Sequence, residues 1–134
     1  MNVLVIDNYD SFTYNLVQYL ERISGVKVTV KRNDKLHPEE AGGFEKILIS
    51  PGPGIPDEAG HTKEIIERFG PLKSILGVCL GHQAIAEVYG GSIRNLNRVY
   101  HGVPSDIQQT VKDDYLFRGV PAEFEAGRYH SWIV

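Results

Sequence analysis

The sequence has little of what several protein classes need. One cysteine among 134 residues cannot form a disulfide within the chain, which is typical of a reducing compartment. The apolar run at residues 3–6 is far shorter than the ~20 residues of a membrane-spanning helix, and no basic segment precedes it. We therefore expect a cytoplasmic protein without a membrane partner.

Charge and histidine spacing argue against two further classes. A net charge of −3 gives no general attraction to nucleic acid. The five histidines include no pair at the spacing of metal ligands, and a single cysteine does not complete a zinc site. We expect no metal, no other cofactor and no nucleic-acid partner.

Strand and helix patterns alternate over residues 3–89. Short apolar runs predict strands at residues 3–6, 26–30, 46–50 and 74–78. Apolar residues at helical spacing predict helices at residues 12–23, 62–69 and 80–89. The apolar face of the first helix would comprise Phe12, Leu16, Tyr19, Leu20 and Ile23, with a cap from Asp10 or Ser11. This order is typical of the α/β class, an open, mostly parallel sheet with helices on both faces.

After Gly91 the pattern changes. Half-exposed strands are predicted at residues 93–99, 107–111 and 124–134, which indicates a hairpin-rich C-terminal section. No repeat or linker separates this section from the rest. We therefore expect a single domain over residues 1–134.

The only cysteine, Cys79, lies in the run Gly77-Val78-Cys79-Leu80-Gly81, between a predicted strand and a predicted helix. Small flanking residues let a strained turn of this kind present a nucleophile above a sheet. The helix would direct its N–H groups and positive dipole end at the sulfur and favour the thiolate. The pattern indicates a catalytic nucleophile rather than a small buried hydrophobic residue.

The loop at residues 50–54, Ser-Pro-Gly-Pro-Gly, follows another predicted strand. Because ligands collect at the carboxyl ends of parallel strands, Asp7, Ser50 and Cys79 are expected at one edge of the sheet. The glycines allow close backbone approach and the prolines fix the shape, as an oxyanion hole requires, although a structural turn stays open. The loop matches no phosphate-binding pattern. A phospho-acceptor receiver domain is excluded because Ser50 stands where its aspartate is required.

The predicted helix after the cysteine carries two further candidates for the site. Gln83 lies one helical turn beyond Cys79, so its amide can lie near the sulfur. His82 is close to Cys79 in sequence. However, a strained turn of this kind, which we call the elbow, points the Cys79 thiol away from the helix that carries His82. We therefore do not expect His82 to be the general base.

Taken together, the motifs resemble the class I (triad-type) glutamine amidotransferases, and among them the small glutaminase subunits of anthranilate and aminodeoxychorismate synthases. The matching motifs cover the chain in family order, at residues 7–16, 50–54, 77–83 and 128–131. The resemblance implies a flavodoxin-like sheet. For the segment at residues 7–16, a structural role and a partner contact stay equally open.

The resemblance also implies a reaction and a site. Cys79 would attack the side-chain amide of L-glutamine, and the N–H groups of Gly52 and Leu80 would form the oxyanion hole. The substrate-binding residues would be Gly52, Pro53, Gly54, Gln83, Ser131 and Trp132. Ammonia would pass to a chorismate-binding synthase subunit, component I.

The sequence departs from the family in three respects. Val103-Pro104 interrupts the usual polar stretch after residues 101–102. Trp132 stands where leucine is commoner. The family's base and orienting acid lie in a His-Pro-Glu segment, which is absent here. We expect a chain truncated before that segment, or completed from elsewhere, with little glutaminase activity in isolation.

Two alternatives remain open. One is a non-catalytic module of the same fold that binds or regulates a synthase partner. The other is a cysteine esterase-like hydrolase, for which His101 and His130 are the candidate bases.

Overall fold

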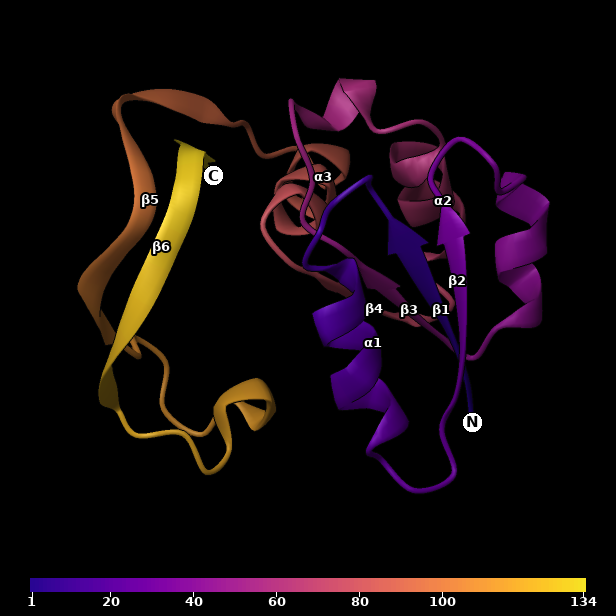
Figure 1. The fold of residues 1–134 in the computed structure, drawn as a ribbon, viewed down its shortest axis with the longest axis horizontal. Coiled ribbons are helices and arrows are strands. Elements are labelled where there is room, and N and C mark those ends of the chain that lie inside the picture. The colour runs from indigo at the N-terminus through magenta and orange to yellow at the C-terminus, as the bar shows by residue number, and fades with distance from the viewer. The chain divides into compact units, whose positions relative to one another are not determined.

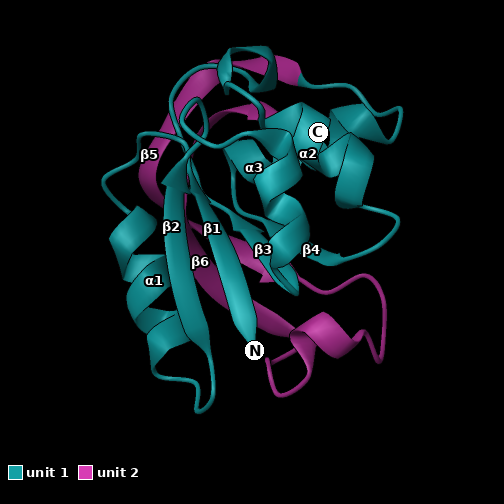
Figure 2. Ribbon diagram, turned by 90° about the vertical axis from the view of Figure 1, so that its right-hand side faces the viewer, with its two compact units in different colours: residues 1–93, 134 teal, residues 94–133 magenta.

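The computed structural model describes all 134 residues, which form two compact units (Figure 2). The first unit comprises Met1–Ile93 together with Val134, and the second comprises Arg94–Ile133. The grouping of both units into one domain over residues 1–134 stays a prediction. None of the helices combines the length and the apolar composition that crossing a membrane requires.

The first unit alternates strands and helices in the predicted order (Figure 1). Its strands are β1 (Asn2–Asp7), β2 (Lys27–Arg32), β3 (Lys46–Ile49) and β4 (Ser74–Gly77). Its helices are α1 (Thr13–Glu21), α2 (Thr62–Phe69), α3 (Leu80–Val88) and the short 3-10 turns η1 (Pro38–Gly43) and η2 (Pro56–Glu58). The four strands form one parallel sheet in the order β2-β1-β3-β4, which confirms the expected α/β class.

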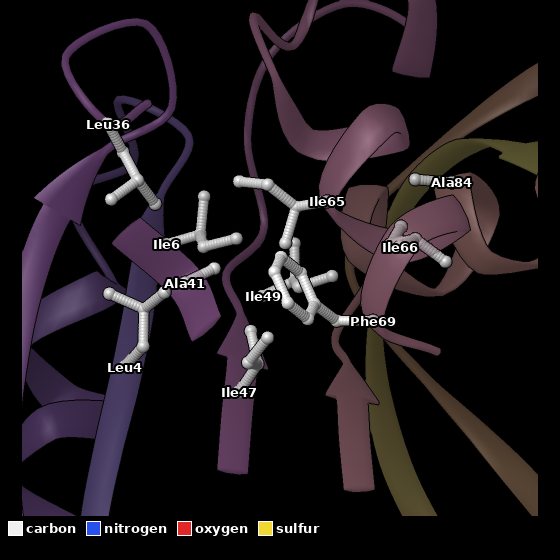
Figure 3. Close-up of a cluster of buried hydrophobic side chains, with 10 residues drawn as sticks. All are labelled: Leu4, Ile6, Leu36, Ala41, Ile47, Ile49, Ile65, Ile66, Phe69 and Ala84. Carbon is white, nitrogen blue, oxygen red and sulfur yellow. The ribbon is translucent and has the colours of Figure 1, made fainter. Parts of the chain in front are cut away.

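Both faces of the sheet are covered. Alternate side chains of a strand point to opposite faces, so Leu4 and Ile6 of β1 pack with Ile49 of β3 against α2 and α3. Figure 3 shows Ile65 and Phe69 of α2 directed toward these strands. Val5 points to the other face and packs with residues of α1. Because β1 is buried on both faces, it reads in the sequence as a continuous apolar run.

Helix α1 differs from its prediction in its face and in its cap. Leu16 and Leu20 pack on the sheet around the buried Val17, but Phe12, Tyr19 and Ile23 are exposed. Phe12 rather than Asp10 or Ser11 occupies the N-cap position. The Asp10 carboxylate instead accepts the Phe12 N–H at 2.9 Å, so it closes the turn before the helix.

The second unit is a long antiparallel hairpin of β5 (Arg94–Gln108) and β6 (Glu123–Ile133), with the short turn η3 (Tyr115–Phe117) between them. The prediction of three short strands was wrong here, because residues 94–99 and 107–108 belong to the single strand β5, and residues 109–111 lie in no strand. A register shift near Gly102, where φ is +69°, interrupts that strand locally. The interrupted alternation makes one bent strand look like two.

Candidate active site

Cys79 lies at the sharp turn between β4 and α3. Its backbone has φ 51° and ψ −106°, a region that residues other than glycine rarely occupy. The Val78 N–H donates to the Ile49 carbonyl at 3.0 Å, and the Gln83 N–H donates to the Cys79 carbonyl at 2.9 Å. The strained elbow expected from the sequence is therefore present, with Cys79 half-buried immediately before α3.

Two glycines allow this turn because backbone passes close to backbone beside them. A Cβ on Gly81 would lie 2.6 Å from the Ile49 carbonyl oxygen, and a Cβ on Gly77 would lie 2.5 Å from the Gly81 carbonyl oxygen. Such approaches are far inside van der Waals contact. A larger residue at Gly81 would push the start of α3 away from β3, and one at Gly77 would push it away from β4.

The Ser-Pro-Gly-Pro-Gly loop passes beside the same helix start. A Cβ on Gly52 would lie 2.5 Å from the Asn8 Cβ and 2.9 Å from the Leu80 Cδ2. The backbone of Gly52 therefore lies against Leu80, the residue that directly follows Cys79. This arrangement brings together the two residues whose N–H groups the resemblance assigns to an oxyanion hole.

The electrostatics of the thiol differ from the expectation. Burial raises the pKa of the Cys79 thiol, a hydrogen bond from the Leu80 N–H lowers it, and the Asp10 carboxylate raises it further. The net direction is upward, so the start of α3 favours the thiolate less strongly than burial opposes it.

The two candidates on α3 differ in their surroundings. Gln83 is buried, with an exposed fraction of 5%, one turn after Cys79. His82 is exposed on the same helix, consistent with the view that it is not the base. No three or more His, Cys, Asp or Glu side chains come together in an arrangement that could hold a metal ion.

Four buried polar residues connect the strand ends beneath the loop; we call Asn8, Asn33, Ser50 and Thr62 the strand-end network. The Asn8 amide donates to the Ser50 carbonyl at 2.8 Å, and its oxygen accepts from Asn33 at 3.0 Å and from Thr62 at 3.1 Å. The Asn8 N–H donates to the Ser50 hydroxyl oxygen at 2.9 Å. The network ties the start of the loop to β1, β2 and α2.

A hollow of about 290 Å³ opens beside this network, lined in part by Asn8, Asn33, Pro53 and Leu80. Tyr9 also lines it and donates its hydroxyl to the Asp34 carboxylate at 2.5 Å. That bond raises the pKa of the Tyr9 phenol and lowers the pKa of Asp34. Pro53 of the loop and Leu80 at the start of α3 therefore line a hollow that lies beside the Cys79 turn.

The remaining predicted site residues, Ser131 and Trp132, lie in β6 of the second unit. Next to them, the His130 Nε2 accepts from the Arg128 Nε at 3.1 Å, and the His130 Nδ1 lies 3.0 Å from the Trp132 carbonyl oxygen. Both ring nitrogens of His130 are therefore engaged within the hairpin, with the Nδ1 proton directed at the carbonyl.

The sequence matches the family model described as "Glutamine amidotransferase class-I" over residues 4–134, almost the whole chain. The chain belongs to the class I glutamine amidotransferase family. This confirms the resemblance carried by the elbow and the Pro-Gly loop.

Among curated relatives, this amidotransferase is 48% identical over 134 residues to "Aminodeoxychorismate/anthranilate synthase component 2" of Bacillus subtilis. It is 46% identical over 134 residues to "Aminodeoxychorismate synthase component 2" of Escherichia coli. Each match covers 98% of this chain, but 68% and 70% of the respective relative. With "Anthranilate synthase component 2" of Lactococcus lactis the share is 66%, so the chain spans about two thirds of the relatives it matches.

Solved structures show the same fold. A glutamine amidotransferase from Thermotoga maritima superposes with a TM-score of 0.77 at 15% identity, covering 99% of this chain and 61% of that one. A glutamine amidotransferase from Methylobacillus flagellatus gives 0.72 at 20% identity, over 98% and 55%. At these identities the likeness concerns the fold alone.

Sequence reasoning about this amidotransferase missed Asn8, Asn33 and Thr62. A usable signal existed for the first two, because each directly follows a strand, as Ser50 does. The order β2-β1-β3 then places Asn33, Asn8 and Ser50 side by side. Thr62 opens a helix, and only the packing of α2 on the sheet brings its hydroxyl to Asn8.

Proposed function

We propose that this protein is the glutaminase subunit of a chorismate-using synthase, with Cys79 as its nucleophile. The carrying observation is the strained elbow at Cys79 with the Gly52 backbone lying against Leu80. An elbow presents the sulfur, and two neighbouring backbone N–H groups can stabilise the negative oxygen that develops when the sulfur attacks.

In this proposal the reaction has two acyl-transfer steps. The Cys79 Sγ attacks the side-chain amide carbon of L-glutamine; a C–S bond forms, the C–N bond breaks, and the nitrogen leaves as ammonia with the thiol proton. Water then adds to the thioester and the C–S bond breaks, which releases glutamate and restores the thiol. The N–H groups of Gly52 and Leu80 stabilise the oxyanion in both steps.

Substrate binding is assigned to the loop backbone at Gly52, Pro53 and Gly54 and to Gln83, Ser131 and Trp132. The buried position of Gln83 one turn after Cys79 supports its part in this assignment. For the residues of β6 the assignment rests on the Arg-Tyr-His-Ser motif at residues 128–131. No cofactor takes part.

The names of the relatives support a synthase partner, since they are component 2 proteins of anthranilate or aminodeoxychorismate synthases. We propose that the ammonia is delivered to a chorismate-binding component I. A cytoplasmic location is supported by the single cysteine and by the biosynthetic role that those names imply.

One observation favours a second candidate, a non-catalytic module that binds the synthase. Burial raises the pKa of Cys79, as it would for a structural cysteine. The esterase-like alternative gains no such support. Both ring nitrogens of His130, one of its two candidate bases, are engaged by Arg128 and Trp132, and the other candidate, His101, packs edge-on against the Tyr129 ring.

Thiol labelling distinguishes the two candidates. We expect 6-diazo-5-oxo-L-norleucine, an electrophilic glutamine analogue, to label Cys79 in a saturable reaction, measured by intact mass. L-glutamine should protect the thiol and D-glutamine should not, and Cys79→Ser should abolish labelling. Labelling that is unsaturable and unaffected by L-glutamine would contradict a glutaminase and favour the module.

The partner is tested separately. Mixed with an anthranilate synthase component I, the protein should form a complex that co-elutes in size-exclusion chromatography, and Cys79→Ser should bind equally well, because partner binding needs neither the thiol nor the absent His-Pro-Glu segment. Failure with both anthranilate and aminodeoxychorismate synthase components would contradict the proposed partner class.

A further inference from the structure

We infer that Asn8, Asn33 and Thr62 are positioning residues that hold the Gly52 N–H in place for the oxyanion. This inference rests on the proposed function and gives a role to part of the segment at residues 7–16. None of the three would touch the substrate; they would act through the loop that carries Gly52.

Asn8 contacts the loop at two points. Its amide donates to the Ser50 carbonyl at 2.8 Å, at the point where the chain leaves β3. Its Cβ and carbonyl oxygen also form the surface on which Gly52 rests, 2.5 and 2.6 Å from where a Cβ would be. Any shift of Asn8 is therefore passed to the Gly52 backbone.

Two hydrogen-bond donors set the orientation of the Asn8 side chain. Its Oδ1 accepts from the Asn33 amide at 3.0 Å and from the Thr62 hydroxyl at 3.1 Å. With the oxygen fixed by two donors, the amide nitrogen must face the Ser50 carbonyl. A flip of the side-chain amide would set the Asn8 oxygen against the Ser50 carbonyl oxygen and the Asn8 NH2 against the Asn33 NH2, so these contacts favour one orientation.

All three side chains are buried. Asn8 is 2% exposed, Asn33 5% and Thr62 0%, so their hydrogen bonds are made almost entirely within the protein. A buried network of this kind is rigid when complete and loosens when one member is removed. An oxyanion donor needs such rigidity because small displacements weaken the stabilisation of the transition state.

The test compares two buried threonines. Thr62→Val removes a donor to Asn8 at nearly constant volume, whereas Thr62→Ser keeps it. Thr13→Val is the matched control, since Thr13 is equally buried but donates to the Asp7 carboxylate at 2.9 Å and not to Asn8. Should Thr62→Val fold poorly, Asn33→Ala removes the other donor to the same oxygen.

We expect Thr62→Val to lower the maximal rate of labelling by 6-diazo-5-oxo-L-norleucine by about tenfold to a hundredfold. The half-saturating concentration should stay unchanged, because the interaction acts on the reaction rather than on binding. Thr62→Ser should restore most of the rate, and Thr13→Val should keep it. Reaction with methyl methanethiosulfonate, which has no carbonyl for the hole, should be equal in all variants.

A second readout follows the loop directly. The backbone amide resonances of Gly52 and Gly54 should shift in Thr62→Val and not in Thr13→Val. If wild-type and Thr62→Val proteins label at the same maximal rate, the positioning role is wrong while the glutaminase proposal stands. If the analogue does not label the wild-type protein, the proposed function fails and this inference fails with it.

Discussion

In the sheet unit, Leu4, Ile6 and Ile49 are fully buried between strands and helices, whereas no residue of the hairpin unit Arg94–Ile133 is buried. The hairpin is held by its ladder of backbone pairs and by ring contacts. The Arg128 guanidinium lies 3.7 Å from the centroid of the Tyr100 ring, and Tyr100 stacks on His130 at 5.5 Å.

This difference in burial indicates which unit can hold side chains and backbone groups in fixed positions. A burial-driven unit resists local change because every side chain is packed against several others. A two-stranded hairpin is marginal by itself, and ring contacts add only about 0.5–1 kcal/mol each. It is therefore significant that the elbow, the loop and the strand-end network all lie in the sheet unit.

The largest expected effect is on the sheet core. Ile66→Ala should cost about 2–5 kcal/mol of unfolding free energy, because Ile66 is fully buried in α2. The matched change in the hairpin, Ile107→Ala, should cost below about 1 kcal/mol, because Ile107 is only half-buried. Urea unfolding measures both, followed by far-UV circular dichroism for Ile66→Ala and by Trp132 fluorescence for Ile107→Ala.

The only tryptophan, Trp132, reports on the hairpin separately. We expect its fluorescence transition to come at lower urea than the loss of helical signal, and Ile66→Ala to narrow the gap. If the fluorescence and circular dichroism transitions of the wild-type protein coincide, the hairpin unit is not less stable than the sheet unit and the expected difference is wrong.

Next in size is a glycine comparison. Gly81→Ala should cost about 1–3 kcal/mol, because the new methyl meets the Ile49 backbone. Gly127→Ala should cost less than about 0.5 kcal/mol, since its methyl meets only the side chain of the exposed Tyr129, which can move. Thermal unfolding measures both; equal losses of Tm would show that the hairpin is as tightly constrained as the sheet.

A smaller effect is expected from Tyr100→Leu, which removes the ring that contacts both Arg128 and His130. We expect a loss of about 0.5–1 kcal/mol, confined to the Trp132 fluorescence transition. Tyr115→Leu serves as the control, because Tyr115 is 82% exposed and should give no change. An equal shift of the circular dichroism transition would contradict independent behaviour of the two units.

The smallest effect concerns the thiol. Because the Asp10 carboxylate helps to raise the pKa of Cys79, Asp10→Asn should lower that pKa. The thiolate fraction at a given pH then increases, so the pH profile of labelling by methyl methanethiosulfonate should move toward lower pH. Asp106→Asn in β5 changes the net charge equally and should leave the profile in place; a profile unchanged by Asp10→Asn would refute the local effect.

The sequence predicted an element well where its apolar residues are buried on one face, and less well where they are exposed. Helix α2 begins and ends at the predicted residues, because Ile65, Ile66 and Phe69 form a single apolar face. The face of α1 was predicted less well, since three of its apolar residues are exposed. In β5 the bulge near Gly102 hides the continuity of the strand, because a register shift interrupts the alternation on which strand prediction depends.

The sequence by itself determined the family, the parallel sheet and the position of Cys79 at a strand-to-helix turn, since these follow from local patterns and motif spacing. Only the tertiary structure decided which residues surround the thiol. The strand order places Asn8 between Asn33 and Ser50, and the packing of α2 adds Thr62. Likewise, burial and the nearby Asp10 reverse the expected direction of the Cys79 pKa. Solvation and contacts between distant segments are properties of the folded chain, so no local pattern encodes them.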